Sequence, residues 1–262
     1  MKTTIFYFTG TGNSLKVARD LYESLDDCIM APMVNDWEKD VIVTISEKIG
    51  FVFPMHYWGL PRVVYDFIYK LNLDKVKYIF AVITRSSELD AVALPQIEEL
   101  LNKSSKHLNA GYFIEMPANY ILGEETHSKE EQEEFFKKEA KQIRKIVNDI
   151  NSNKMTAKID PTKKKRSFEK TNKGFRDNVF ESDKFFHVDD SCSSCGICEK
   201  VCPVSNIKLV EGKPQWKHKC VQCLACIHYC PEVSIQYGDK TLKRGRYHHP
   251  EITVKDMMDQ KT

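Results

Sequence analysis

The chain has 262 residues, of which 42% are hydrophobic and 29% charged, and 39 Lys and Arg nearly balance 37 Asp and Glu. A net charge of +2 gives no reason to expect nucleic-acid or membrane binding by the whole chain. No stretch is long and apolar enough to span a bilayer, and Met1 is followed almost at once by the first predicted strand, so we expect no signal peptide and a cytoplasmic protein.

A glycine-rich loop follows the first predicted strand. Residues 3–8 are β-branched and aromatic, as in a strand buried on both faces, and apolar residues recur at helical spacing over 15–25. The loop between them is expected to present backbone N–H groups at a helix N-terminus, where an anion is favoured. The residues assigned to this anion site are Thr9, Gly10, Thr11, Gly12, Asn13 and Ser14.

The residue types in this loop discriminate among phosphate ligands. Leu15 stands where a dinucleotide fingerprint needs its third glycine, which disfavours NAD. The lysine of a P-loop is missing too, which disfavours a nucleoside triphosphate. A cradle of hydroxyl groups remains, which suits a phosphate monoester and resembles the phosphate loop of flavodoxins. The alternative is an ordinary strand-turn-helix connection whose glycines only make the turn.

Strands and helices alternate through the rest of the N-terminal half. Alternation of this kind predicts parallel βαβ units, so the expected fold class is α/β, with a flavodoxin-like, doubly wound parallel sheet of five strands. A capping box at Ser128 predicts the start of a longer helix. The other predicted elements are strands over 28–33, 49–54, 78–84 and 111–116 and helices over 62–71 and 95–108.

Two more loops are expected at the carboxyl ends of strands, where an open parallel sheet binds its ligand. The first has adjacent aromatic residues on which a planar isoalloxazine ring can stack, the alternative being that Tyr57 and Trp58 pack on neighbouring helices. His56 is interpreted as polar packing rather than as a proton donor. The second loop is polar and offers backbone groups to the pyrimidine edge of a flavin. The residues are Pro54, Met55, His56, Tyr57, Trp58 and Gly59 in the first loop and Thr84, Arg85, Ser86 and Ser87 in the second.

Eight of the nine cysteines lie between Cys192 and Cys230 and form two copies of one motif. Each copy is a C-x-x-C-x-x-C-x-x-x-C-P run, which matches the bacterial ferredoxin pattern. Three closely spaced thiolates bind one face of a cubane cluster, and in bacterial ferredoxins the fourth comes from the other copy. The expected ligand sets are Cys192, Cys195, Cys198 and Cys230, and Cys220, Cys223, Cys226 and Cys202.

Structural zinc and disulfides are the alternatives for these cysteines. Zinc sites usually pair two Cys-x-x-Cys knuckles across a longer span, and a cytoplasmic location keeps thiols reduced. Gly196, and Ala225 at the corresponding place in the second copy, are small residues that would let backbone amides approach the cluster sulfurs. Cys28 is most simply a buried small hydrophobic residue.

The concentration of cysteines divides the chain into chemically different parts. The Lys163-Lys164-Lys165-Arg166 run lies in the segment between them, which is basic and weakly periodic. We interpret it as a solvated connector, with docking of an acidic redox partner as the alternative. The predicted parts are a flavodoxin-like FMN-binding domain over 1–153, a basic linker over 154–184, a small α+β ferredoxin domain over 185–240 and a polar tail over 241–262.

The order of these motifs resembles a known family. The segments FTGTGNS, GFVFPMHYWGLP, MPANY and CSSCGICEKVCP are similar to landmarks of the EFR-type flavodoxin-ferredoxin fusion family, and the resemblance covers most of the chain. It implies FMN and two 4Fe-4S clusters in a cytosolic redox protein of anaerobic metabolism.

The motifs and the resemblance together predict an iron-sulfur flavoprotein. It is expected to transfer electrons between two 4Fe-4S clusters, FMN and a soluble redox partner protein or small electron acceptor. No acid-base pair is evident, so no catalytic residue is assigned and an FMN-dependent oxidoreductase activity stays open. The alternatives are an electron carrier without substrate turnover and a redox sensor. The sequence does not indicate the oligomeric state.

Overall fold

The N-terminal half contains a five-stranded parallel sheet with the strand order β2-β1-β4-β6-β7. The structure is a computed structural model that describes residues 2–87, 91–157, 159 and 165–261. Counted along the chain, the strand order is 2-1-3-4-5, which is flavodoxin-like and confirms the predicted doubly wound α/β fold. The elements are β1 (Thr3–Tyr7), α1 (Asn13–Ser24), β2 (Cys28–Pro32), η1 (Met33–Asn35), β3 (Ile42–Val43), β4 (Lys48–Pro54), α2 (Arg62–Lys70), β5 (Leu71–Asn72), β6 (Tyr78–Arg85), α3 (Ala93–Asn102), β7 (Ala110–Glu115) and α4 (Lys129–Asn151).

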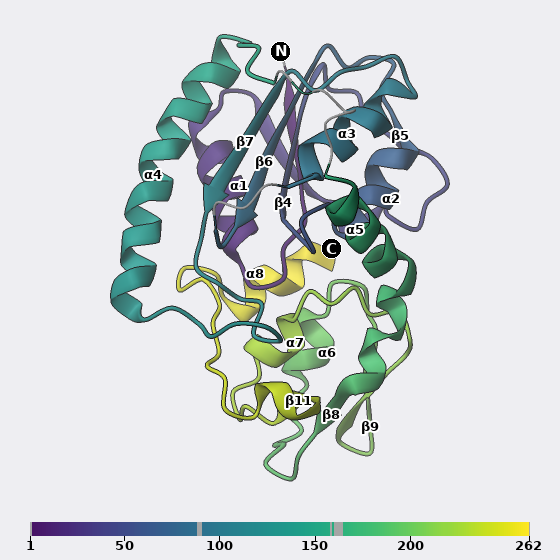
Figure 1. The fold of residues 1–262 in the computed structure, drawn as a ribbon, viewed down its shortest axis with the longest axis vertical. Coiled ribbons are helices and arrows are strands. Elements are labelled where there is room, and N and C mark those ends of the chain that lie inside the picture. Colours follow the sequence, from purple (N-terminus) through teal and green to yellow (C-terminus); the bar gives the residue numbers. More distant parts are fainter. Residues whose placement is uncertain (1, 88–90, 158, 160–164, 262) are drawn as a thin grey trace.

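Helices cover both faces of the sheet, with α1 and α4 on one side and α2 and α3 on the other (Figure 1). Ile5 and Tyr7 of β1 belong to the core layer under α1 and α4, whereas Phe6 belongs to the layer under α2 and α3. This alternation follows from the two-residue period of a strand. Ile5 pairs with Met30 of β2 and Gly50 of β4, so β1 is a central strand.

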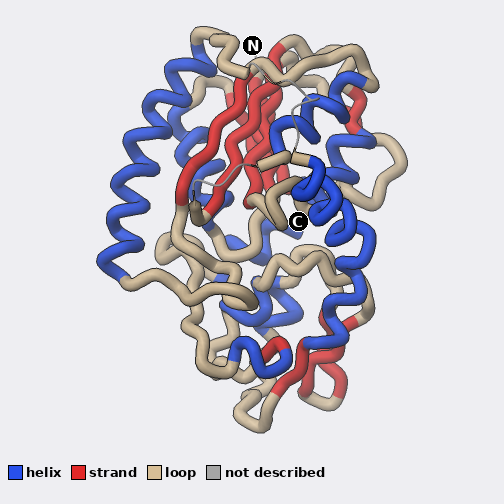
Figure 2. The backbone as a smooth tube through the Cα atoms, viewed as in Figure 1, coloured by secondary structure: helices blue, strands red, loops and turns tan. Residues whose placement is uncertain are grey.

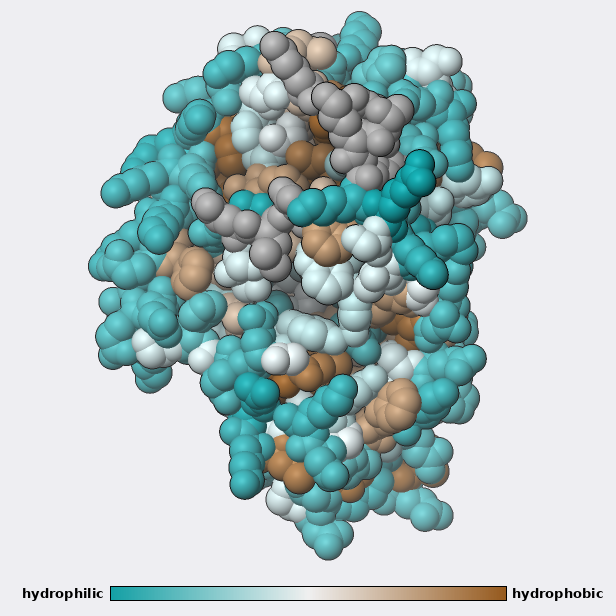
Figure 3. Space-filling model, viewed as in Figure 1, coloured by the Kyte–Doolittle hydropathy of each residue, from teal (hydrophilic) through white to brown (hydrophobic). Residues whose placement is uncertain are grey.

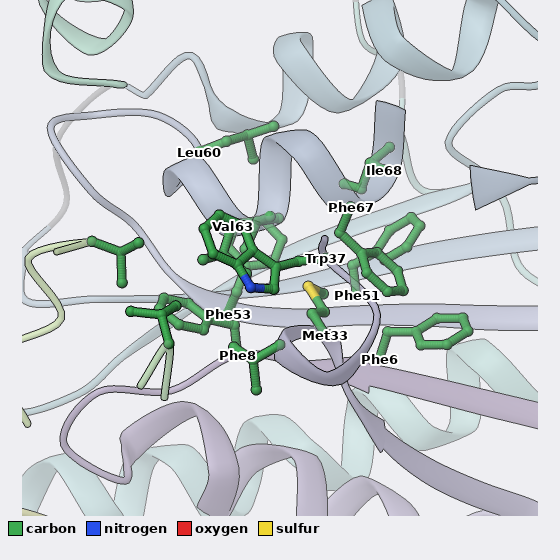
Figure 4. Packing of buried hydrophobic residues seen from close by; sticks show 14 of the residues in the cluster. Phe6, Phe8, Met33, Trp37, Phe51, Phe53, Leu60, Val63, Phe67 and Ile68 are labelled. Carbon is green, nitrogen blue, oxygen red and sulfur yellow. The ribbon is translucent and has the colours of Figure 1, made fainter. Parts of the chain in front are cut away.

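Aromatic rings dominate the core layer beneath α2, as Figure 4 shows. The Phe6 ring centroid lies 4.9 Å from that of Phe67 and 6.4 Å from that of Phe51. Each buried aromatic side chain removes about 150–250 Å² from water, so this layer contributes strongly to stability. The same layer continues into the cysteine-rich part of the chain through Cys198 and Cys202.

The C-terminal part is built from short helices and short strands. β9 pairs with β10 and β8 pairs with β11, both antiparallel, which confirms the predicted smaller second domain. Figure 2 shows these strands at the end of the molecule remote from the parallel sheet. The elements are α5 (Arg166–Asn178), η3 (Val179–Phe185), β8 (Phe186–Val188), α6 (Ile197–Val201), β9 (Ile207–Val210), β10 (Lys213–Trp216), α7 (Ala225–His228), β11 (Ile235–Tyr237), η4 (Gly238–Thr241), α8 (Val254–Met258) and η5 (Asp259–Lys261).

Helix α5 lies in the segment that we predicted to be a linker. Its Asn172 is fully buried, and the side-chain Nδ2 donates to the carbonyl oxygens of His56 (2.8 Å) and Leu60 (3.2 Å). Asn172 Oδ1 accepts hydrogen bonds from Gln96 (3.0 Å) and from the buried Arg176 (2.9 Å). The expectation of a solvated connector is therefore wrong over 166–178. Apolar periodicity is weak there because the buried face of the helix carries polar residues.

Two other predictions about this segment, the role of the basic run and the domain boundaries, stay predictions. Lys163 and Lys164 of the basic run lie outside the described residues. The domain boundaries themselves stay predictions, because burial of α5 does not show where an independently folding unit begins.

The C-terminal segment returns to the parallel sheet rather than forming a purely polar tail. Tyr247, His249 and Ile252 are buried, and Ile252 and Met257 belong to the core layer under α1 and α4. Figure 1 shows α8 between the sheet and the cysteine-rich part. The segment therefore ties the two parts of the chain together.

The molecular surface is largely hydrophilic on the face that Figure 3 shows, with hydrophobic side chains in separate patches. Among the helices of the described residues, none has the length and apolar character needed to cross a membrane.

Candidate iron-sulfur and flavin site

The eight motif cysteines form two sets, which we name the first and second thiol sets. Each set surrounds a small cavity and takes three cysteines from one motif copy and the fourth from the other, as the sequence predicts. All nine cysteines of the chain are free thiols. Within the described part of the chain, no three His, Cys, Asp or Glu side chains are placed to hold a single metal ion. The first set is Cys192, Cys195, Cys198 and Cys230, and the second is Cys202, Cys220, Cys223 and Cys226.

The thiols of five motif cysteines lie in surroundings that raise their pKa and favour the neutral form: Cys198, Cys202, Cys220, Cys223 and Cys226. Burial raises the pKa of the Cys198 thiol to about 11 and that of the Cys220 thiol to about 12. Cluster iron would therefore have to displace protons as it binds. Backbone N–H groups already point at two sulfurs: Asn206 donates to Cys202 Sγ (3.2 Å) and Gln222 to Cys220 Sγ (3.3 Å). Such donors stabilise negative charge on a cluster thiolate.

The two motif copies share an unusual backbone conformation. Gly196 has a φ of 74° and Leu224 a φ of 62°, both left-handed. Each is the N-cap of a short helix, and its carbonyl oxygen accepts a hydrogen bond four residues on, from Lys200 (3.2 Å) and His228 (3.1 Å) respectively. The counterpart of Gly196 is thus Leu224, and our expectation that Ala225 takes this place is wrong.

The glycine-rich loop lies at the N-terminus of α1, with Gly12 as the N-cap at a φ of 97°. The amide of Gly12 donates to Thr9 Oγ1 (3.1 Å). The amides of Thr11, Asn13 and Ser14 donate no hydrogen bond to any residue that the structure describes. Unpaired amides at a helix N-terminus form a site that favours an anion.

The side chains of this loop are buried and hydrogen bonded within the protein. Thr9 Oγ1 and Thr11 Oγ1 act as acceptors, so their hydroxyl hydrogens stay available for a further acceptor. Fewer polar groups of the loop are thus available to a phosphate than the sequence predicts, because several of them already have hydrogen-bond partners. These hydrogen bonds join Ser14 Oγ to Thr84 Oγ1 (2.8 Å), Asn119 Nδ2 to Thr11 Oγ1 (2.6 Å), Tyr247 Oη to Asn13 Oδ1 (2.6 Å) and Asn13 Nδ2 to the carbonyl oxygen of Pro117 (3.1 Å).

Gly10 is the point where the loop meets the second thiol set. A Cβ at this position would lie 2.1 Å from the carbonyl oxygen of Cys223. Only glycine lets the two backbones approach this closely. At Gly10 the space beside the loop is taken by the second cysteine motif.

A cavity of about 330 Å³ lies beside Gly10 and the second thiol set. Its walls are loops that follow β1, β4, β6 and β7, together with the second cysteine motif. Strand-end loops converge in this way because the strands are parallel. The predicted residues that line it are Gly10, Pro54, Met55, His56, Tyr57, Trp58, Ser86 and Ser87.

Eight predicted contact residues do not line this cavity: Thr9, Thr11, Gly12, Asn13 and Ser14 of the glycine-rich loop, and Gly59, Thr84 and Arg85. Gly59 pairs with His56 across a hairpin turn, through hydrogen bonds of 3.0 and 2.9 Å. Thr84 is bonded to the glycine-rich loop, and the Arg85 guanidinium lies 4.5 Å from the centroid of the Phe113 ring.

Several lining residues had no assigned role in the sequence. Asn119 and Tyr120 belong to the MPANY segment, whose resemblance to the fusion family was the available signal. Gln222, Cys223 and Leu224 also line the cavity, but the cysteine motif gives no sign of this second role.

Tyr57 and Trp58 form the hairpin turn, with φ values of 46° and 63°. Bulky residues in this left-handed region cost about 1–2 kcal/mol each, and such strain is concentrated at ligand sites. Helix α5 supports the turn: the Tyr57 ring stacks on Phe175 (4.3 Å between centroids) and the Trp58 ring on Phe168 (5.0 Å). The alternative that Tyr57 and Trp58 pack on a neighbouring helix is therefore correct for one face of each ring. Both residues also line the cavity.

The comparisons with known proteins concern the first cysteine motif most directly. A family profile described as a 4Fe-4S binding domain matches residues 186–208, which include Cys192, Cys195, Cys198 and Cys202. The chain contains a ferredoxin-type 4Fe-4S domain. Domains of this type hold iron-sulfur clusters for electron transfer.

Among solved structures, the chain is similar to a Bacteroides uniformis protein described as a flavoprotein. The two share 16% identity, the match covers 52% of this chain and 98% of that chain, and the TM-score is 0.36. Comparison with curated protein sequences finds no match.

Proposed function

We propose that the protein holds FMN in the 330 Å³ cavity and a 4Fe-4S cluster in each thiol set, as the resemblance to the EFR-type fusion family implies. It would transfer electrons among these groups and a soluble redox partner or small acceptor. The observation that carries the proposal is the position of Cys223. This residue lines both the cavity of the second thiol set and the larger cavity, and its carbonyl oxygen meets Gly10.

The cavity supplies surroundings for the ring system of such a flavin, and the glycine-rich loop beside it supplies amides for the phosphate. In the glycine-rich loop only Gly10 lines the cavity, and the other loop residues are buried beneath Tyr247, His249 and Ile252. The amides of Thr11, Asn13 and Ser14, which have no partner among the described residues, would hold the phosphate at the N-terminus of α1 with this C-terminal segment displaced. Tyr57 and Trp58 would lie beside the ring system, held by α5. When bound, FMN supplies both one-electron and two-electron chemistry.

The two thiol sets differ in their access to solvent, which supports an order of transfer. The second set adjoins the large cavity through Cys223 and Leu224. In the first set Cys195 is exposed, so a partner protein can approach that set from outside. We expect electrons to pass between partner and flavin by way of the first and then the second set.

A carrier without substrate turnover is the second candidate function. The cavity volume of about 330 Å³ lies at the lower end of the range for ligand pockets, about 300–1,000 Å³. A bound flavin leaves little room there for an acceptor molecule. Burial lowers the pKa of His56 to about 4, so this lining residue is neutral and a poor proton donor at neutral pH.

The flavin assignment predicts a preference for FMN over riboflavin. Protein purified without oxygen is expected to release FMN on denaturation. The flavin-free form is expected to bind FMN at least about tenfold more tightly than riboflavin, because only FMN has a phosphate that can accept hydrogen bonds from the loop amides. Fluorescence titration of each flavin measures the affinities. Equal affinities would contradict the phosphate site. Exchange of reduced protein with redox proteins but not with quinones would favour the carrier.

A further inference from the structure

The two cysteine motifs have the same backbone conformation but different residue types at the position after the second cysteine. Gly196 in the first copy and Leu224 in the second adopt the same left-handed conformation. Glycine adopts it without strain, whereas a leucine side chain clashes with its own backbone. Around Gly196 the nearest atom to an added Cβ is Leu209 Cδ2, at 4.0 Å, so there is space there for a side chain. The second copy therefore has backbone strain at a position where the first copy has none, and this strain needs an explanation that applies to the second copy alone.

The location of Leu224 supplies that explanation. Leu224 is 4% exposed and lines both the large cavity and the cavity of the second thiol set. Gly196 lines the first set's cavity and not the large one. Leu224 therefore lies at the boundary between the second thiol set and the space in which we place the flavin, and glycine would leave this boundary without a side chain.

We propose that Leu224 is an apolar partition that keeps the water and polar groups of the flavin cavity away from a cluster in the second thiol set. The inference rests on the proposed function. Reduction of the cluster adds one electron and one negative charge, which water stabilises, so exclusion of water lowers the reduction potential. Leu224 thereby favours release of that electron to the flavin. It is a positioning residue, because it acts through the surroundings of the cluster.

Truncation of Leu224 tests the proposal in the anaerobic holoprotein. Leu224→Ala and Leu224→Gly are expected to raise the ratio of reduced to oxidised form of one cluster by about tenfold at a fixed potential, which corresponds to a shift of about 59 mV for a one-electron couple. A redox titration followed by electron paramagnetic resonance measures both clusters. The cluster of the first set serves as the internal reference. Iron of the second set is also expected to pass to a chelator several-fold faster.

Two further variants separate this role from a merely structural one. Leu224→Met keeps an apolar side chain of similar volume and is expected to keep the wild-type potential. Gly238→Ala places a side chain in the same left-handed region of the backbone, with no atom within 4 Å of it and outside both thiol sets and the large cavity, and is expected to leave both potentials unchanged. In thermal unfolding, Leu224→Gly is expected to melt above Leu224→Ala, because glycine relieves the backbone strain.

Unchanged potentials in both truncation variants would overturn the proposal, as would equal shifts of both clusters. If the alanine and glycine variants lose their clusters altogether, a shift in Leu224→Val, which shortens the side chain less, supports the partition, and no shift in that variant overturns it. Wild-type protein that holds two clusters but no flavin would refute the proposed function instead. In that protein the effect of Leu224 on the second cluster can still be measured.

Discussion

Gly10→Ala is expected to disrupt the junction between the parallel sheet and the cysteine-rich domain. The added Cβ would lie 2.1 Å from the carbonyl oxygen and 3.0 Å from the carbonyl carbon of Cys223. These are backbone atoms of a motif held by its own thiol set, so they cannot turn aside as a flexible side chain does. Overpacking of this kind costs about 3 kcal/mol or more. We therefore expect a free energy of unfolding lower by at least that amount, with loss of flavin and of the second cluster.

The control for this variant is Gly174→Ala. No atom lies within 4 Å of an added Cβ at Gly174, which is exposed in α5. Alanine in a helix interior is favoured over glycine by about 1 kcal/mol, so this variant should be slightly stabilised. Denaturant unfolding with iron and flavin analysis measures both variants. A Gly10→Ala protein with wild-type stability and cofactor content would show that the contact with Cys223 is dispensable.

Cys202→Ser and Cys220→Ser are expected to remove the same cluster, although the two residues belong to different motif copies. Each single variant should lower the iron content from about eight to about four atoms per chain, and the double variant should lose no more. The physical reason is that both thiols line one cavity. Iron and labile sulfide, measured on anaerobic protein, give the content.

The control for this experiment is a double variant of Cys198 and Cys202. These residues lie in one motif copy, but they line different cavities. The double variant Cys198→Ser with Cys202→Ser is therefore expected to lose both clusters. Retention of about four iron atoms in that double variant would mean that each motif copy binds its own cluster, contrary to the observed sets.

The parallel sheet could be predicted from the sequence because its signals are local. Buried strands read as continuous apolar runs, and the capping box at Ser128 marks the start of α4, where both of its hydrogen bonds are present. Helix α5 was not predicted from the sequence, because Asn172 and Arg176 make its buried face polar. Burial of the C-terminal segment was not predicted either. Ile252 and Met257 are isolated apolar residues in a polar stretch, and their burial depends on contacts with distant parts of the chain.

The candidate site shows the same division between local and long-range information. The cysteine spacing predicts which thiols share a cavity, since the constraint lies in the motif itself. The contact of Gly10 with Cys223 and the left-handed conformation of Leu224 depend on how the two parts of the chain meet. No pattern in either segment alone contains that information.

A reductive titration of the anaerobic holoprotein decides whether a flavin and both thiol sets work together. We predict uptake of about four electrons per chain, two by FMN and one by each of two 4Fe-4S clusters. The flavin absorbance and the cluster signals should change within the same titration. Uptake of only about two electrons, with either the flavin or the cluster signals missing, would contradict the proposal.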